Sequence, residues 1–225
     1  MKTIIKGGTV ITATDTFAAD LLLDCGRIAQ IGADLPAAGA RVVDAAGMLL
    51  LPGGIDVHTH LELPFFGTVA ADDFYTGQRA AAFGGTTSHI DFAIQYKGES
   101  LHQAVENWQH KARDKAVLDY GLHVAITDLN DTVMAEIPAL ASAGVTTIKL
   151  FQAYKGVYQV DDATLFRSGQ PAKRTHPGFR GRATMTKGTN LLGSRGLRLI
   201  AWRRRPGGSV MKASPTRPRL RPRTA

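Results

Sequence analysis

The last acidic residue of this 225-residue chain is Asp162, and the sequence changes character shortly after it. Residues 1–167 carry 12 Lys and Arg against 19 Asp and Glu, a formal charge of −7. Residues 168–225 carry 15 Lys and Arg and no acidic residue, a charge of +15, together with six of the ten prolines. We therefore interpret an acidic body and a basic, Pro-rich tail separately, and expect only the body to form a packed core.

Composition excludes several classes of protein. Hydrophobic residues make up 44% of the chain and charged residues 20%, as in a globular protein rather than a disordered one. The single cysteine, Cys25, rules out an intrachain disulfide and fits a reducing compartment. No apolar run reaches the roughly 18 residues that a membrane span needs, and the N-terminus lacks the apolar stretch of a signal peptide. We expect a cytoplasmic protein that does not bind membranes.

Two kinds of pattern follow each other within the body. Residues 1–52 contain short β-rich runs bounded by turns, with a hairpin around Gly26, and predict a small β-module. Residues 53–167 alternate between strand-like and helix-like segments, which indicates about four βα units around a parallel sheet. Such units suit either an open doubly wound sheet or the first half of an eight-stranded barrel. The expected strands are 55–61, 86–94, 117–127 and 146–151, and the expected helices are 71–83, 100–115, 132–142 and the opening turn 161–167.

Two histidines, His58 and His60, lie at the end of the first of these strands. Alternate residues of a strand face the same side, so both imidazoles are expected to point in one direction. Neutral imidazole is a ligand for Zn²⁺, but such a pair can equally be two strand histidines that make ordinary hydrogen bonds. The position favours metal binding, because barrel active sites assemble at the C-terminal ends of the strands.

The stretch from Pro52 to His60, Pro-Gly-Gly-Ile-Asp-Val-His-Thr-His, resembles the opening metal motif of the cyclic amidohydrolases. The body is similar to the dihydropyrimidinase and D-hydantoinase branch of that family through residues 72–74 (Asp-Asp-Phe), 83–87 (Phe-Gly-Gly-Thr-Thr) and 144–151 (Gly-Val-Thr-Thr-Ile-Lys-Leu-Phe). The resemblance covers about residues 1–167. It implies an α/β fold, namely the first half of a (β/α)8 TIM-type metallo-hydrolase barrel, preceded by a small β-sandwich module and followed by an irregular tail.

The resemblance also implies a reaction and a metal site. The reaction is metal-dependent hydrolysis of the cyclic amide bond of dihydropyrimidines or hydantoins, which gives N-carbamoyl amino acids. Two divalent ions, usually Zn²⁺, are bound in this family, and His58 and His60 would hold the more buried one. Lys149 would be carbamylated by CO₂ and would bridge both ions. Burial favours the neutral amine that reacts with CO₂.

The same resemblance implies residues that contact the substrate, a small cyclic amide or ureide. Tyr154 would support the substrate and the oxyanion that forms at the attacked carbonyl. The loop residues Leu63, Phe65 and Phe66 would line the pocket for the substituent of the ring.

Part of the implied ligand set is missing from the body. In the family, two further histidines come from the fifth and sixth strands and a catalytic aspartate comes from the eighth. We expect His89 and His123 to be structural, and His176, the only histidine of the tail, has the turn-like context Thr-His-Pro-Gly. We therefore expect no measurable hydrolysis by this chain, and aggregation or misfolding, because half a barrel leaves a strand edge uncovered. Full-length relatives are commonly homotetramers.

Two explanations of residues 168–225 remain open. A shift of reading frame near codon 167 in GC-rich DNA would produce Arg, Pro, Gly, Ala and Ser with few acids, as in the tail. Alternatively, the tail is a genuine basic extension that binds nucleic acid without sequence specificity, since Arg203–Arg205 and residues 217–223 could neutralise phosphates. Only two aromatic side chains of the tail, Phe179 and Trp202, could stack on bases.

Overall fold

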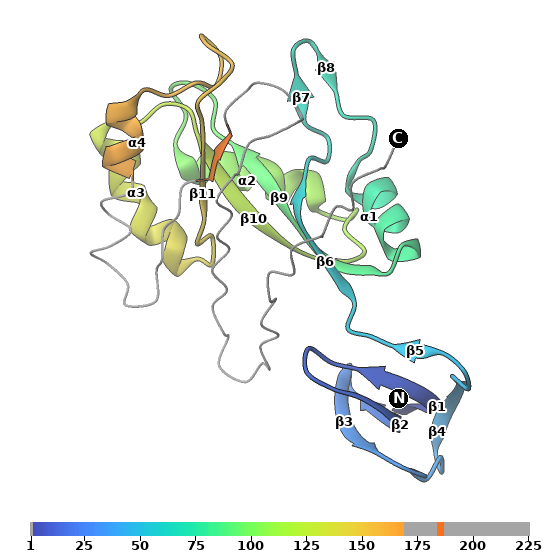
Figure 1. Cartoon of the computed structure of the whole chain (residues 1–225). Coiled ribbons are helices and arrows are strands. Elements are labelled where there is room, and N and C mark those ends of the chain that lie inside the picture. Colours follow the sequence, from blue (N-terminus) through green and yellow to red (C-terminus); the bar gives the residue numbers. More distant parts are fainter. Residues whose placement is uncertain (1, 169–183, 187–225) are drawn as a thin grey trace, which may run out of the picture. The chain divides into compact units, whose positions relative to one another are not determined.

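The computed structural model describes residues 2–168 and 184–186, which form two compact units divided between Gly53 and Gly54 (Figure 1). The other tail residues, including His176, lie outside the described residues. Among the described residues, no helix is both long enough and apolar enough to cross a membrane.

The N-terminal unit is a five-stranded sheet built around its first strand. On one edge, β1 (Lys2–Ile11) pairs antiparallel with β2 (Thr16–Asp24), which pairs antiparallel with β3 (Arg27–Gly32). On the other edge, β1 pairs in parallel with β4 (Ala40–Asp44) and further along with β5 (Leu49–Leu50). The unit therefore has a mixed sheet in which β1 is central.

The expected hairpin is confirmed between β2 and β3. Cys25 and Gly26 have φ values of 47° and 72°, the left-handed values that a two-residue hairpin turn favours. The expected β-module is present as one sheet, and no second sheet faces it within residues 2–53, because β4 and β5 both pair with the free edge of β1. As a result, several large apolar side chains of this unit are exposed, among them Ile28, Ile31, Val42 and Leu49.

The second unit is a parallel sheet whose strands follow one another in chain order. Its strands are β6 (Gly54–Thr59), β9 (Thr86–Ile94), β10 (Asp119–Ile126), β11 (Ile148–Phe151) and β12 (Thr184–Thr186). Each pairs in parallel with the next. In a doubly wound sheet, the spatial order of the strands reverses at a switch point. Among the described residues, the strands of this sheet follow chain order without such a reversal. Of the two architectures that the sequence allowed, the half-barrel is the one observed.

Helices connect these strands in chain order (Figure 1). The helices are α1 (Phe74–Phe83), α2 (Leu101–Ala112), α3 (Asp131–Ser142) and α4 (Asp162–Ser168). Asp73, Ser100 and Asn130 cap the first three by accepting a backbone N–H with their side chains. The main core joins helix residues such as Trp108 to strand residues such as Ile126.

The observed elements lie close to the expected ones, with two additions. A small hairpin, β7 (Pro64–Phe65) and β8 (Thr68–Val69), forms in the loop after β6. In the tail, which we expected to be irregular, β12 adds a three-residue strand to the edge of β11. Strand β6 also ends at Thr59, two residues before the expected end.

Candidate metal and substrate site

A β-bulge precedes the two histidines of the predicted metal motif. Between Asp56 and Thr59, β6 advances by three residues while β9 advances by two. Such a bulge redirects the side chains that follow it. Within this irregular stretch, the backbone N–H of His58 donates to Asp56 Oδ1 at 3.0 Å. His58 is therefore held by a local hydrogen bond rather than by a regular ladder.

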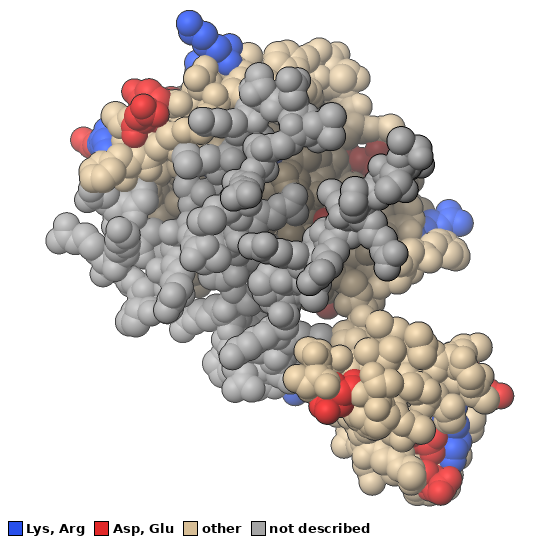
Figure 2. Space-filling view, viewed as in Figure 1, with Lys and Arg blue, Asp and Glu red and all other residues tan. Residues whose placement is uncertain are grey.

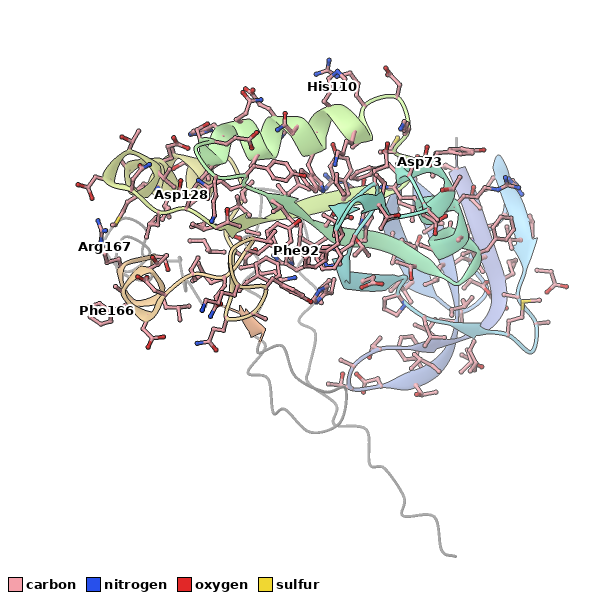
Figure 3. The ribbon with its side chains drawn as sticks, turned by 90° about the horizontal axis from the view of Figure 1, so that it is seen from above. Asp73, Phe92, His110, Asp128, Phe166 and Arg167 are labelled. Carbon is pink, nitrogen blue, oxygen red and sulfur yellow. The ribbon has the colours of Figure 1, made fainter. Side chains whose placement is uncertain are left out.

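The ring of Phe92, on β9, is contacted by all three predicted metal ligands. Its centroid lies 4.6 Å from the ring of His58 and 5.0 Å from that of His60. The Nζ of Lys149, on β11, lies 4.0 Å from the same centroid. Phe92 lies on the face of the sheet opposite α2 (Figure 3). The structure thus brings His58, His60 and Lys149 together on the inner face of the half-barrel.

Lys149 is buried among aromatic side chains. Only 3% of its surface is exposed, and its Nζ also lies 4.7 Å from the centroid of Phe151. Burial lowers the pKa of the Lys149 amine from 10.5 to about 8, against an opposing effect of the Asp91 charge. A fraction of this amine is therefore neutral near physiological pH, and the neutral form is the nucleophile that attacks CO₂.

His60 has the chemistry of a metal ligand. Burial, and to a smaller degree the positive charges of Lys149 and His58, lower the pKa of His60 from 6.5 to about 4. The ring is therefore neutral, and its buried Nδ1 has no hydrogen-bond partner. Within the part of the chain that the structure describes, no three His, Cys, Asp or Glu side chains gather as a metal site. The residues thus fit one ion with two imidazoles, and a carbamate on Lys149 would be the third donor.

His89 and His123, the two buried histidines of this unit, have partners for both ring nitrogens. His123 bonds to a backbone carbonyl of β6 through Nε2, at 3.1 Å, and to Thr147 Oγ1 through Nδ1. His89 bonds to Thr59 Oγ1 through Nδ1 and to the Gln78 side chain through Nε2, at 2.8 and 2.7 Å. Burial lowers the pKa of both histidines. In this arrangement both rings act as structural links.

Aromatic rings join the loop after β6 to the loop after β11. The ring of Phe65 lies 4.5 Å from that of Phe66 and 5.4 Å from that of Tyr154. Tyr158 stacks on Phe65 at 5.9 Å and donates its hydroxyl to the Pro64 carbonyl at 3.3 Å. We call Phe65, Phe66, Tyr154 and Tyr158 the aromatic cluster. It brings three of the four predicted substrate residues together.

The aromatic cluster adjoins the Lys149 amine through Phe151. Phe151 contacts both Tyr154, at 5.9 Å between rings, and the Nζ of Lys149. Leu63 packs against the main hydrophobic core, as Phe65 of the cluster also does. Phe66 and Tyr154 have left-handed backbone angles, with φ of 47° and 65°, which cost non-glycine residues about 1–3 kcal/mol each. The loops around the site therefore hold strained positions.

Sequence reasoning did not single out two residues that organise the site, Phe92 and Asp91. Nothing in the sequence distinguishes Phe92 from an ordinary core aromatic. Asp91 did leave a signal, because an acidic residue in the apolar strand 86–94 must find hydrogen-bond partners if it is buried.

Comparison with known proteins finds relatives of similar sequence and structure. No protein-family model matches the chain. A D-hydantoinase of Geobacillus stearothermophilus is 52% identical over 174 residues, 77% of this chain and 37% of the relative. A dihydropyrimidinase of Rattus norvegicus is 43% identical over 178 residues, 76% of this chain and 34% of the relative. The crystal structure of dihydropyrimidinase from Brevibacillus agri NCHU1002 matches with a TM-score of 0.78 and 51% identity, over 82% of this chain and 40% of that one.

Over its N-terminal part, this chain is a homologue of the D-hydantoinases and dihydropyrimidinases. The homologue spans less than two fifths of the length of these relatives. The match to a D-hydantoinase crystal structure, with a TM-score of 0.73, confirms the parallel half-barrel with a β-sheet module before it. The residues of the candidate site all lie in this hydantoinase-like half-barrel.

Proposed function

We propose that the described residues carry the first part of a cyclic amidohydrolase metal site, in which His58, His60 and Lys149 hold a divalent ion such as Zn²⁺. The reaction of the complete site is hydrolysis of the cyclic amide bond of a dihydropyrimidine or hydantoin to an N-carbamoyl amino acid. The convergence of two imidazoles and a buried amine on the ring of Phe92 carries this proposal. A cytoplasmic location belongs to it as well.

Each residue has a distinct role in this proposal. His58 and His60 would each present a ring nitrogen to the ion. The neutral amine of Lys149 would add to CO₂, forming an N–C bond as one C–O π bond breaks and a proton leaves, and the resulting carbamate would carry one negative charge shared by two oxygens. A bound divalent ion lowers the pKa of water and polarises a carbonyl. Tyr154 would donate its hydroxyl to the substrate oxyanion, and the other rings of the aromatic cluster would contact the substituent.

We further propose that the 225-residue chain has no hydrolytic activity of its own. The complete site needs a second ion and a carboxylate that moves a proton. After Arg167 the sequence contains one histidine, His176, and no acidic residue. With three donors, the chain would bind one ion weakly.

Calorimetric titration of the purified chain with ZnCl₂ in bicarbonate buffer tests the metal part of the proposal. We expect one ion per chain, lost in His60→Ala and retained in His110→Ala, which removes an exposed histidine of α2. Binding that survives His60→Ala would contradict the site. Assays with dihydrouracil and a 5-substituted hydantoin should show no turnover, and turnover that a chelator abolishes would contradict the proposed inactivity.

A second candidate function, non-specific nucleic-acid binding through residues 168–225, rests on the charge of +15 in that segment. On the face seen in Figure 2, the Lys and Arg side chains of the described residues lie among acidic ones and form no basic patch. Fluorescence anisotropy with labelled single-stranded DNA tests it. Binding that weakens steeply with added salt would support this function.

A further inference from the structure

We propose that Asp91 is a positioning residue for the metal-binding histidines: it holds the Thr59 side chain and the Leu61 backbone N–H, on either side of His60, and so sets the direction of both imidazoles. This inference rests on the proposed metal site. Asp91 is fully buried on β9 and contacts Trp108 of α2, so it lies on the helix-covered face of the sheet. Its neighbour Phe92 faces the imidazoles on the inner side.

The carboxylate of Asp91 accepts four hydrogen bonds, two on each oxygen. Oδ2 accepts from Thr59 Oγ1 and from the backbone N–H of Leu61, each at 2.9 Å. Oδ1 accepts from the backbone N–H of Phe92 at 2.7 Å and from Trp108 Nε1 at 3.1 Å. A carboxylate has about four lone-pair positions, so all of them are used. An asparagine cannot reproduce this arrangement, because its NH₂ group would face two donors.

A chain of side chains fixes the direction of the Thr59 hydroxyl. Gln78 Oε1 accepts from two backbone N–H groups before β10, which leaves Gln78 Nε2 to donate to His89 Nε2 at 2.7 Å. His89 therefore carries its proton on Nδ1 and donates to Thr59 Oγ1 at 2.8 Å. The proton of the Thr59 hydroxyl is then available to its two acceptors, Asp91 Oδ2 at 2.9 Å and the Ile90 carbonyl at 3.3 Å, of which the carboxylate is the nearer.

The residues that Asp91 holds alternate with the proposed ligands. Thr59 lies between His58 and His60, and Leu61 follows. Because neighbours in extended backbone face opposite sides, holding Thr59 toward the helices directs both histidines toward the inner face. The bulge interrupts the pairing of β6 with β9 immediately before Thr59. Pairing resumes at Thr59, which lies opposite Asp91, so the side-chain contact between these two residues sets this direction together with the resumed pairing.

Helix α2 supports the same segment from the next residue. Lys111 Nζ lies 3.8 Å from the centroid of the Trp108 ring and donates to the carbonyl of Glu62 at 2.9 Å. Lys115 pairs with the Glu62 carboxylate at 2.9 Å. Residues 59–62 are thus tied to both β9 and α2, and the Trp108 bond to Asp91 connects these two anchors.

Titration of the full chain with Co²⁺ in bicarbonate buffer, followed by its visible absorption bands, tests the proposal. We expect Asp91→Asn to weaken Co²⁺ binding about 10- to 100-fold and to change the bands, as loss of an outer contact at a metal site does. Thr59→Val should weaken binding similarly, and Thr59→Ser, which keeps the hydroxyl, should restore it. Wild-type affinity and bands in Asp91→Asn would overturn the proposal.

Gln95, the residue that follows the last residue of β9, offers a matched control. Its fully buried side chain also makes four hydrogen bonds, to backbone groups of Glu99, Thr127 and Asp128, and none to β6. Gln95→Glu should lower the melting temperature while leaving Co²⁺ affinity and bands unchanged. Equal weakening in Gln95→Glu and Asp91→Asn would mean that Asp91 acts only through general stability, and would overturn the proposal.

A metal-free measurement separates this proposal from the proposed function. If the wild-type chain does not bind Co²⁺, the metal site is wrong. Imidazole nitrogen NMR of the metal-free chain still tests Asp91: His89 should show the Nδ1-protonated form, and Asp91→Asn should shift the signals of His58 and His60. Hydrogen exchange of the Leu61 amide should also become faster. Unchanged signals and exchange would overturn the positioning role.

Discussion

The amine of Lys149 lies 4.0 Å from the centroid of Phe92, and two opposing effects meet at this contact. An aromatic face attracts an ammonium ion by about 0.5–2 kcal/mol, which favours the charged form. Burial opposes it, and the pKa of Lys149 falls to about 8. Loss of solvation therefore outweighs the attraction of the ring. The site keeps a lysine that is partly neutral, which a surface lysine is not.

Carbamylation of Lys149 should increase as the pH rises through about 8. At pH 7 a pKa of about 8 leaves roughly one tenth of the amine neutral, which is about 300 times the neutral fraction of an unperturbed lysine. Carbon NMR with labelled bicarbonate should detect one carbamate that grows between pH 6 and pH 9. Lys149→Arg should abolish it, whereas Lys155→Arg, at an exposed lysine, should not. A carbamate signal that persists in Lys149→Arg would contradict this prediction.

Acid should destabilise the second unit before its carboxylates protonate. The pKa values of His60, His89 and His123 lie below the usual 6.5 in the folded chain, with that of His60 at about 4. Between pH 6.5 and pH 4, these histidines bind more protons in the unfolded chain than in the folded chain. The free energy of unfolding therefore falls as the pH falls through this range. Urea denaturation at stepped pH measures this loss. Removing an exposed histidine with His110→Gln should not change it, and a flat profile down to pH 4.5 would contradict it.

Much of the second unit could be predicted from sequence, because its strands and helices have different periods. Apolar runs such as 86–94 and helical spacing such as that around Trp108 gave elements close to those observed. Whether the sheet is doubly wound or part of a barrel depends on the spatial order of its strands. The local hydropathy pattern of the sequence carries no information about that order. In the N-terminal unit, β4 and β5 are short and their side chains are mostly exposed, so alternation left little signal.

The site was predictable only where a residue type carries its own chemistry. His58 and His60 stand out by spacing, and Lys149 stands out in an apolar strand. The bulge in β6 comes from three-dimensional pairing with β9, and no residue pattern announces it. The contacts of the Phe92 ring with His58, His60 and Lys149 likewise depend on how β6, β9 and β11 align in three dimensions.

Truncation in the core should be far more costly than the same change on the surface. Ile126 on β10 is fully buried, whereas Val117, in the loop before that strand, is 53% exposed. Ile126→Ala should lower the free energy of unfolding by about 2–5 kcal/mol, because it removes apolar contacts and leaves a cavity. Val117→Ala should change it by less than about 0.5 kcal/mol. Urea denaturation of both variants measures the difference, and equal effects would mean that the half-barrel lacks a packed core.

The coding DNA should show whether the tail of this hydantoinase homologue arose by a shift of reading frame. Similarity to the Geobacillus relative extends over 77% of the chain, and the last acidic residue is Asp162. The similarity and the acidic residues therefore end in the same region of the sequence. A one-base insertion or deletion near codon 167 should restore a frame that continues α4 and then encodes a strand with a histidine at its end. Sequencing of genomic DNA and mass spectrometry of the native protein test this. If neither shifted frame encodes such a strand, the basic extension explains the tail, and its charge of +15 becomes a property of the working protein.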